Sequence, residues 1–453
     1  MRYLITGATG LIGRNLIRHL LRDRHEVVAL TRHPHRFKML PSHNVFSWHH
    51  EQEPPTTAFE GVDVVINLAG EGIAEKKWTP ARKRALEQSR VLGTRHIISA
   101  LQRMTKSARP KVLISGSAIG FYGERRDEAL TERSPRGVGF LSDLCVHWEE
   151  EALKGESLDM RVVLLRTGIV LSKEGGALSQ MPPVVIGDGK DWLSWIHIED
   201  AVRFIAFASE NAEISGAYNV VAPKPVHNKK FIQTLTKARK YPARLYTPKI
   251  FPQVALGDMS EALLSSLEVL PERALAEGFV FLHPQLDGAL KDLFAADTYL
   301  DRYVFKDQFV PLPPKSIFAF FSQAENLGAL TPPWLNFKIV KKSSPELTKG
   351  SLIDYQIKIR GAPLRWRTLI SEWQPDVRFA DEQLNGPYKR WHHVHSFVPV
   401  HGGTLVCDEV TYRLPGGLLG NVVLKNWVGN DVRSIFQYRQ EKISELVENG
   451  TLR

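Results

Sequence analysis

Three glycines near the start of the chain are spaced for binding an anion. Gly7, Gly10 and Gly13 lie in the run TGATGLIG, between an apolar stretch at Tyr3–Thr6 and a helical pattern at Leu11–Arg24. At this spacing the first glycine permits a tight turn, the second lets backbone approach a pyrophosphate, and the third lets helix and strand pack closely. The phosphates would lie at the positive N-terminus of the helix. Because strand, turn and helix occur in the required order, the spacing predicts a dinucleotide site.

Two arginines near this turn bear on which dinucleotide fits. The second apolar run, Val27–Leu30, is followed by Thr31 and Arg32, where sites specific for NAD usually carry an acid that holds the ribose hydroxyls. Arg14, at the start of the first helix, is a second cation. Guanidinium groups bind phosphate through paired hydrogen bonds, so Arg14 and Arg32 favour NADP(H). The alternative is that both are solvated surface arginines.

Small and hydroxyl-bearing residues after the next two apolar runs complete the predicted site. Small side chains in the run Asn67–Gly70 would let the adenosine half of the cofactor lie against backbone, and Ser117 ends the following strand, where catalytic hydroxyls lie in such sheets. The predicted cofactor-binding residues are Thr6, Gly7, Gly10, Leu11, Ile12, Gly13, Arg14, Thr31, Arg32, Asn67, Leu68, Ala69, Gly70 and Arg166.

The elements that must position these residues follow from an alternation of apolar runs and helical patterns over the first 295 or so residues. Such alternation predicts βαβ units and a parallel sheet covered on both faces, a doubly wound α/β fold of the Rossmann type. The predicted strands are Tyr3–Thr6, Val27–Leu30, Val62–Asn67, Lys111–Ser115 and Arg161–Leu165, and the predicted helices include Leu11–Arg24, Pro80–Leu101 and Leu141–Leu153.

The pattern changes near residue 297. In Ser351–Arg360 apolar and polar residues alternate strictly, which is typical of an antiparallel strand with one wet face. Similar runs are Pro363–Trp373, Arg390–Val400 and Thr404–Leu414. The chain closes with an amphipathic helix. We therefore predict two domains, residues 1–296 and residues 297–453, with about 245–296 as the C-terminal segment of the first.

Composition excludes several classes of protein. The net charge of +10 is spread evenly, with 20 Lys+Arg against 15 Asp+Glu from residue 301 onward and 39 against 34 before it. No basic arm is present, so a nucleic-acid partner is not indicated. Cys145 and Cys407 are the only cysteines, too few for a disulfide framework, and no signal peptide or membrane span is evident. We expect a cytoplasmic protein.

Several motifs carry a family resemblance. TGATGLIG, NLAGEGIA, SGSAIGFYG, FLSDLCVHWE, LLRTGIVL and SWIHIEDAV occur in this order. Residues 1–295 resemble the extended short-chain dehydrogenase/reductase superfamily, and specifically its atypical group of epimerase-family, nucleoside-diphosphate-sugar-epimerase-like proteins. The stretch from Gly257 to Leu293 is similar to the C-terminal segment of that group. The resemblance implies an NADP(H)-dependent oxidoreductase or epimerase-like enzyme with a small-molecule substrate.

The usual catalytic pair of that superfamily is missing. Its members use a tyrosine acid/base whose pKa is lowered by a lysine four residues on. In the register set by Ser117 and Glu149, these positions fall on Leu141 and Cys145, and neither side chain can do this chemistry. A proton for hydride transfer must come from elsewhere. We predict Tyr122, with Ser117 as its hydrogen-bonding partner, and Cys145 as a weaker candidate; alternatively Tyr122 is only a wall of the pocket.

Four residues are predicted on the substrate side. Lys77 and Trp78 lie on the loop after the NLAG run, and Trp195 and His197 lie in SWIHIED, where extended members of the superfamily turn over the substrate. His197 has a second interpretation, in which it caps a helix or bonds to Asp200.

Residues 298–453 resemble the START-like (SRPBCC or polyketide-cyclase) superfamily. The resemblance rests on an opening strand at Tyr303–Val310, the run LTPPW at Leu330–Trp334 and the long final helix. It implies an α+β helix-grip fold, in which a curved antiparallel sheet and one helix enclose an apolar cavity for a hydrophobic ligand. The alternative is that its aromatic residues simply fill a core.

Histidines cluster in the run WHHVH of this domain. His393 and His395 share one face of a predicted strand, and His392 points away. No nearby cysteine completes a set with recognised zinc spacing. The sequence therefore predicts no metal site.

Three hypotheses about function stay open at this point. The first is the NADP(H)-dependent enzyme fused to a hydrophobic-ligand domain. The second is a non-catalytic NADP(H)-binding sensor or adaptor, which the absence of the Tyr/Lys pair motivates. The third is a structural protein with a vestigial cofactor fold. The substrate and the oligomeric state do not follow from the sequence.

Overall fold

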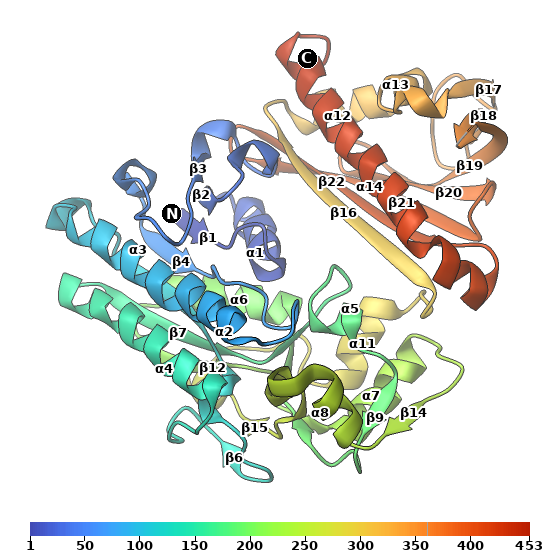
Figure 1. Cartoon of the computed structure of the whole chain (residues 1–453). Coiled ribbons are helices and arrows are strands. Elements are labelled where there is room, and N and C mark those ends of the chain that lie inside the picture. The colour runs from blue at the N-terminus through green and yellow to red at the C-terminus, as the bar shows by residue number, and fades with distance from the viewer. Residues whose placement is uncertain (360) are drawn as a thin grey trace. The chain divides into compact units, whose positions relative to one another are not determined.

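The computed structural model describes residues 1–359 and 361–453 and forms two compact units (Figure 1). The N-terminal unit contains residues 1–37 and 42–298, and the C-terminal unit contains residues 38–41 and 299–453. Arg360, the last residue of one predicted strand, lies outside the described residues. No helix among the described residues is long and apolar enough to cross a membrane.

A seven-stranded parallel sheet forms the centre of the N-terminal unit. Its strand order is β12-β7-β5-β4-β1-β2-β3. The inner strands are almost entirely buried because helices cover both faces, so they are apolar throughout instead of alternating. The strands are β1 (Arg2–Thr6), β2 (Glu26–Thr31), β3 (Val45–Ser47), β4 (Val64–Asn67), β5 (Val112–Ala118), β7 (Arg161–Thr167) and β12 (Gly216–Val220). The predicted doubly wound α/β fold is confirmed.

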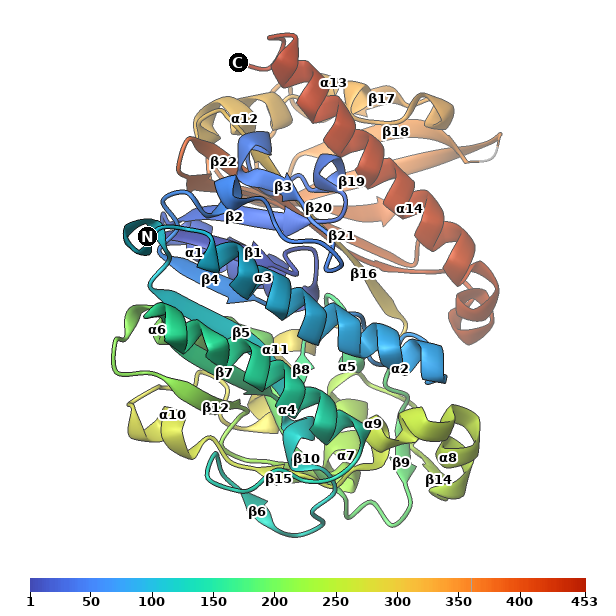
Figure 2. The same ribbon diagram turned by 60° about the vertical axis from the view of Figure 1, so that its left-hand side comes forward.

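The helices of this unit pack in two layers (Figures 1 and 2). Helices α1 (Leu11–Arg22) and α6 (Ile198–Glu210) pack together on one face, and α3 (Gly93–Gln102) and α4 (Phe140–Leu153) on the other. The sequence predicted one helix over Pro80–Leu101. The structure divides it into α2 (Pro80–Glu87), a π-helical turn at Gln88–Leu92, and α3.

The rest of the N-terminal unit consists of short strand pairs and helices. The pairs are β6 (Ala129–Leu130) with β15 (Glu268–Val269), β8 (Ile169–Leu171) with β11 (Trp195–His197), β9 (Val184–Ile186) with β14 (Leu245–Thr247), and β10 (Trp192–Leu193) with β13 (Val226–His227). The helices are α5 (Ala177–Gln180), α7 (Asn228–Ala238), α8 (Ile250–Leu256), α9 (Glu261–Leu264), α10 (Glu272–Ala276) and α11 (Leu286–Phe294).

The C-terminal unit is a seven-stranded antiparallel sheet with a long helix, α14 (Gly417–Glu448), as the helix-grip fold requires (Figure 1). Phe397 and Val406 of the sheet pack with Ile443 and Leu446 of the helix in one core. The strands, in the order β16-β22-β21-β20-β19-β18-β17, have these bounds: β16 Asp301–Val310, β17 Lys338–Lys342, β18 Leu352–Ile359, β19 Ala362–Gln374, β20 Arg378–Asn385, β21 Arg390–Val400 and β22 Gly403–Arg413. Two short helices, α12 (Pro314–Phe321) and α13 (Ala324–Ala329), complete it.

Candidate active site

The glycine turn leaves the N-terminus of α1 open to an anion. A Cβ atom at Gly7, whose φ is +67°, would lie 2.6 Å from the Leu68 carbonyl oxygen, and one at Gly13 would lie 2.4 Å from the Gly7 oxygen. Gly10 is exposed and is the N-cap residue of α1. No side chain among the described residues caps this helix, and its first turn holds no acid. Its first N–H groups and its positive end therefore suit a phosphate.

Thr6 and Asn67 fix the turn at residues 68–70, which follows β4 and belongs to the predicted cofactor site. The Thr6 hydroxyl donates to Asn67 Oδ1 (2.7 Å) and accepts from the backbone N–H groups of Leu68 and Ala69, each at 3.1 Å. Asn67 Nδ2 donates to Thr94 Oγ1 at 2.8 Å. Both side chains are buried, so they shape the turn at 68–70 through its backbone.

The two predicted phosphate-binding arginines lie in different surroundings. Arg32 is largely exposed, and its Nη1 is 3.2 Å from Glu71 Oε1. Glu71 Oε2 accepts from Arg82 at 3.0 Å, and this hydrogen bond, with the charge of Arg32, lowers the pKa of Glu71 although burial opposes the shift. Arg14 Nε is buried and has no hydrogen-bond partner among the described residues. The sequence did not reveal that Glu71 forms an ion pair with Arg32.

Five buried side chains form one hydrogen-bonded chain at the ends of strands β5, β7 and β12. Ser117 Oγ donates to Glu149 Oε1 (2.6 Å), and Arg166 donates to both Glu149 oxygens, at 2.9 and 2.8 Å. Arg166 Nη1 donates to the Tyr122 hydroxyl (3.1 Å), which donates to Asn219 Oδ1 (2.7 Å). The structure thus joins Ser117, Tyr122 and Arg166 in one network with Glu149 and Asn219. Ser117 was the predicted hydrogen-bonding partner of Tyr122, but it bonds to Glu149, and the Tyr122 hydroxyl bonds to Arg166 and Asn219.

The surroundings of this network determine which of its groups hold a proton. Burial raises the pKa of Tyr122, against the charge and the hydrogen bond of Arg166, so the phenol stays protonated at neutral pH. The Arg166 guanidinium lies 3.4 Å from the centroid of the Phe121 ring, and the bonds from Glu149 raise the pKa of Arg166 although burial lowers it. The Ser117 hydroxyl donates a hydrogen bond to the Glu149 carboxylate, which is the arrangement of a hydroxyl that can exchange a proton with a bound molecule. The proton-donor role of Tyr122 stays a prediction.

Leu141 and Cys145 carry no charge in the folded protein. Leu141 belongs to an apolar cluster around Trp78, Leu86 and Leu144. Burial, reinforced by the charge of Glu149, raises the pKa of the Cys145 thiol to about 11, and its Sγ lies 3.6 Å from a backbone carbonyl oxygen. The structure thus gives neither position the chemistry of the usual tyrosine or lysine.

A half-buried cation that sequence reasoning missed lies beside the NLAG turn. Arg90, on the π-helical turn, donates to the backbone oxygens of Leu86 (3.1 Å) and Glu71 (2.9 Å). A Cβ atom at Gly70 would lie 2.9 Å from its Cζ, so a larger residue there would displace the guanidinium. Burial lowers the pKa of Arg90 to about 10, while Cys145 raises it. The only sequence signal was an extra residue in the helical repeat of Pro80–Leu101, because π-turns insert one residue.

The four predicted substrate-side residues do not form one surface. Lys77 is exposed, whereas Trp78 is buried and donates to the Ile73 carbonyl oxygen at 2.9 Å. Trp195, fully buried, donates to the Lys224 oxygen at 3.1 Å. His197 Nδ1 accepts the Glu199 backbone N–H (3.2 Å) and so caps α6. Their contact with a substrate stays a prediction.

Comparison with known proteins assigns the N-terminal unit to a family. Residues 3–221 match the NAD dependent epimerase/dehydratase family, residues 247–293 match a domain of unknown function (DUF1731), and residues 310–437 match the polyketide cyclase / dehydrase and lipid transport family. The Epimerase family protein YfhF of Bacillus subtilis is 35% identical over 302 residues, which are 65% of this chain and 98% of that protein. The chain belongs to the epimerase family. The predicted resemblance to epimerase-family and START-like proteins is confirmed.

Other members of the epimerase family agree. The SDR39U1 homolog of Arabidopsis thaliana, a chloroplastic epimerase family protein, is 34% identical over 64% of this chain and 86% of its own. A crystal structure of human epimerase family protein SDR39U1 with NADPH has a TM-score of 0.57 and 28% identity, covering 65% of this chain and 100% of that one. A nucleoside-diphosphate sugar epimerase from Corynebacterium glutamicum has a TM-score of 0.53 and 30% identity, over 66% and 59%.

Proposed function

We propose that the N-terminal unit binds NADP(H) and acts as an oxidoreductase or epimerase-like enzyme on a small molecule. The observation that carries this is the open N-terminus of α1 beside two arginines. The human relative crystallised with NADPH supports the choice of cofactor. Bound at this turn, NADP(H) would give or take a hydride. Gly10 and the first N–H groups of α1 would hold the pyrophosphate, and Arg14 and Arg32 the 2′-phosphate.

The chain itself would supply the proton. The Ser117 hydroxyl would hydrogen-bond the reacting oxygen, since Glu149, which Arg166 holds in turn, positions it near the end of β5. Tyr122 is the first candidate for the proton donor. Because its hydroxyl accepts from Arg166 and donates to Asn219, its proton would have to pass directly to a bound molecule and not through the guanidinium. Leu141 and Cys145 would shape the pocket and move no proton, because one is apolar and the other is a buried thiol.

Titration with NADPH, followed by the fluorescence of the nicotinamide, tests the cofactor assignment. We expect micromolar binding. Arg32→Ala should weaken NADPH about tenfold and leave NADH unchanged, because one charged hydrogen bond to phosphate is worth about 1.5–3 kcal/mol and Arg32 is partly paired in the free protein. Arg36→Ala, an exposed arginine on the same connection, is the matched control. No binding below millimolar NADPH would refute the proposal.

Turnover tests the proton donors. With any carbonyl substrate that is reduced, Ser117→Ala should lower kcat by about 10²–10⁴, the usual contribution of a positioned proton-transferring group. Tyr122→Phe should lower kcat as well if Tyr122 is the proton donor. Unchanged turnover in Tyr122→Phe would remove Tyr122 from the mechanism, and the proposal that the chain binds NADPH would still stand.

One observation favours a second candidate, a non-catalytic NADP(H) sensor: neither Leu141 nor Cys145 can replace the usual pair. The sensor predicts tight NADPH binding without turnover of any carbonyl compound. A structural protein with a vestigial fold predicts that NADPH does not raise the melting temperature.

We also propose that the C-terminal unit binds a small apolar molecule. Its cavity has a volume of about 170 Å³ and apolar walls that include Leu330, Ile357 and Phe436. A cavity of about 150 Å³ accommodates benzene, so one or two rings would fit. Naphthalene should quench tryptophan fluorescence in the full chain. Ile357→Trp, which fills the cavity, should abolish this, and Val340→Trp, at an exposed site of the neighbouring strand, should not.

A further inference from the structure

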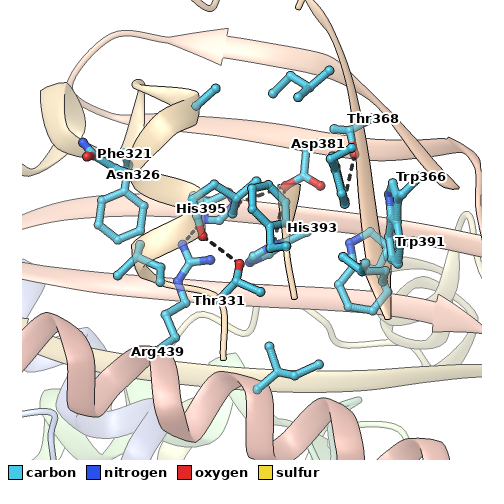
Figure 3. Close-up of a pocket in the computed structure, with 18 of the residues that line it drawn as sticks. Phe321, Asn326, Thr331, Trp366, Thr368, Asp381, Trp391, His393, His395 and Arg439 are labelled. Atoms are coloured by element: carbon cyan, nitrogen blue, oxygen red, sulfur yellow. Dashed lines mark hydrogen bonds and ion pairs between the residues drawn. The ribbon is translucent and has the colours of Figure 1, made fainter. Parts of the chain in front are cut away.

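Two histidines and two aspartates meet on one face of the C-terminal sheet. Asp381 on β20 is opposite His393 on β21, and His395, two residues on, is opposite Asp408 on β22. Because side chains two residues apart in a strand point to the same face, all four lie together. Figure 3 shows Asp381, His393 and His395 beside Arg439 of α14. These residues line the cavity, except Asp408, which lies behind the histidines.

The three cavity-lining donors have the separations of ligands around one ion. His393 Nδ1 and His395 Nε2 are 3.4 and 3.1 Å from Asp381 Oδ2. Ligand atoms of all three residues lie within 4.8 Å of one another. Two ligands about 2.1 Å from a metal, at angles between octahedral and tetrahedral, lie about 3.0–3.4 Å apart. Hydrogen bonds between the histidines and Asp381 hold the donors at these separations in the metal-free protein.

Asp408 orients both imidazole rings from the other side. Its Oδ1 is 2.9 Å from His393 Nε2 and 3.0 Å from His395 Nδ1. A carboxylate behind a histidine fixes the ring and its tautomer, and is a regular feature of metal sites. With its Nε2–H directed at Asp408, the His393 ring turns the lone pair of Nδ1 toward Asp381.

Arg439 sets the charge of the group. Its Nη2 is 3.4 Å from Asp408 Oδ1 and 3.0 Å from His395 Nδ1. In the metal-free protein Arg439 therefore donates to His395 Nδ1, and Nε2–H of that ring donates to Asp381. A metal at Nε2 would require this proton to move to Nδ1, where Asp408 Oδ1 would accept it, and Arg439 to turn from Nδ1 to Asp408. With neutral imidazoles, the two carboxylates and the guanidinium sum to one negative charge, which a buried site favours compensating with a cation.

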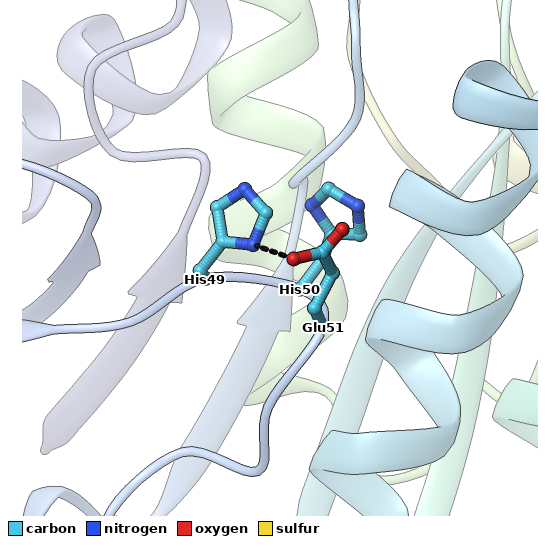
Figure 4. A group of neighbouring side chains, drawn as sticks. All are labelled: His49, His50 and Glu51. Atoms are coloured by element: carbon cyan, nitrogen blue, oxygen red, sulfur yellow. Dashed lines mark ion pairs between the residues drawn. The ribbon is translucent and has the colours of Figure 1, made fainter.

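The other histidine–carboxylate groups of the described residues are less suitable. His197 uses Nδ1 to accept a backbone N–H that the start of α6 fixes in place, so its Nε2 keeps the proton and cannot ligate. The donor to His395 Nδ1 is instead the side chain of Arg439, which can turn to Asp408. The group of His49, His50 and Glu51 is a partly exposed loop cluster (Figure 4), with only the 3.4 Å contact between His49 Nδ1 and Glu51 Oε2 as an ion pair. Neither has a carboxylate behind two rings.

We propose that Asp381, His393 and His395 bind a divalent first-row transition metal such as Fe²⁺ or Zn²⁺. Two histidines and one carboxylate occupy one side of the ion and leave positions open toward the cavity. A small apolar molecule with an oxygen atom would coordinate there. The sequence predicted no metal site. The geometry points to one because Asp381, on the neighbouring strand β20, lies beside the two histidines.

Titration of the chelator-treated full chain with Co²⁺, followed by its visible absorption, tests the proposal. We expect one equivalent to bind, and Zn²⁺ to displace it. His393→Ala should weaken binding at least 100-fold. Asp408→Asn should weaken it about 10–100-fold with the stoichiometry unchanged, as a residue that only orients ligands does. His392→Ala, which removes a neighbouring histidine bonded to Glu382, is the control and should bind as the wild type does.

X-ray absorption of the zinc-loaded wild-type protein gives a test that needs no variant to fold. The spectrum should show two imidazole ligands and the remaining ligands as oxygen or nitrogen. A spectrum with fewer than two imidazoles, or with sulfur, would overturn the proposal. Failure of the wild type to bind micromolar Co²⁺ would overturn it too, as would equal loss in His392→Ala. Near-ultraviolet circular dichroism establishes that each variant is folded.

Discussion

The buried ion pair of Arg166 and Glu149 sets a sharp expectation for the stability of the N-terminal unit. Both side chains are 7% exposed, and they share two hydrogen bonds of 2.9 and 2.8 Å. Arg166→Met keeps an apolar chain of similar length over the Phe121 ring but leaves the Glu149 carboxylate buried. Only the Ser117 hydroxyl then remains as a bonded partner in this network. Tyr122 loses the donor to its hydroxyl oxygen.

Removing one member of a buried pair costs about 3–5 kcal/mol of unfolding free energy, because the other charge stays without compensation. Replacing both members by apolar side chains is about neutral or stabilising. We therefore expect Arg166→Met to lose about 3–5 kcal/mol, and the double variant Arg166→Met, Glu149→Leu to regain at least half. This difference between the double variant and the sum of the two single variants is a coupling energy, and it exceeds the coupling energy of residues that do not touch.

Urea unfolding of the full chain, followed by far-ultraviolet circular dichroism, measures these energies, and hydrogen exchange in β5 and β7 assigns the transition to the N-terminal unit. The control is Arg136→Met. Arg136 pairs with Asp143 at 2.8 Å on the surface, with 51% and 52% of the two side chains exposed, and such pairs are worth about 0–1 kcal/mol. The reasoning fails if Arg166→Met lies within about 1 kcal/mol of the wild type, or if the double variant is less stable than the single one.

Three further perturbations have definite expected results. Gly13→Ala would place a Cβ atom 2.4 Å from the Gly7 carbonyl oxygen, so NADPH affinity should fall at least tenfold; wild-type affinity in a fluorescence titration would contradict this. Burial, with the charge of His283, lowers the pKa of His197 to about 4. The unfolded chain, with a pKa of about 6.5, therefore binds a proton that the native state does not, and the stability is complete above about pH 6.5 and declines by up to about 3 kcal/mol toward pH 4. His197→Asn, which still caps α6, should flatten this profile in urea unfolding, and an unchanged profile would contradict the assignment. Cys145, with its pKa raised to about 11, should resist iodoacetamide at pH 7.5 until urea unfolds the chain, as peptide mass spectrometry would show; rapid native labelling would refute its burial.

The sequence predicted those strands of the parallel sheet that are apolar and lie inside the sheet. β1, β2, β4, β5 and β7 have continuous apolar runs because helices cover them on both faces. The two edge strands were not predicted. β3 is only three residues long, and β12 has the sequence GAYNV, with just two strongly apolar side chains. Short edge strands leave too little periodicity to detect.

The cofactor turn could be predicted, and the buried network could not. Glycine spacing is local, since all three glycines act within one turn. Ser117 and Glu149 are 32 residues apart, and Tyr122 and Asn219 are 97 apart. Their pairing depends on the order of strands in the sheet. Because β12 was missing from the predicted strands, Asn219 had no predicted position.

A missing strand also explains why the sequence did not place an aspartate beside His393 and His395. Alternation within Arg390–Val400 correctly placed His393 and His395 on one face. β20, with the sequence RFADEQLN, is charged and nearly free of apolar alternation, so it was not predicted as a strand. Asp381 was therefore not a neighbour of His393 at that stage. A ligand set spread over two strands has no spacing signature of the zinc-finger kind.

The two units offer chemistry that can be separated experimentally. The cofactor turn and the Ser117 network lie wholly within the N-terminal unit, and the Asp381 group lies wholly within the C-terminal unit. If each proposal is correct, Arg32→Ala should weaken NADPH and leave Co²⁺ stoichiometry unchanged, and His393→Ala should do the reverse. Loss of both readouts in either variant would mean that the substitution perturbs folding or that the units act as one. If instead each ligand weakens binding of the other when both are present, the change in affinity measures a coupling free energy between the two sites. This coupling free energy is the same in either direction.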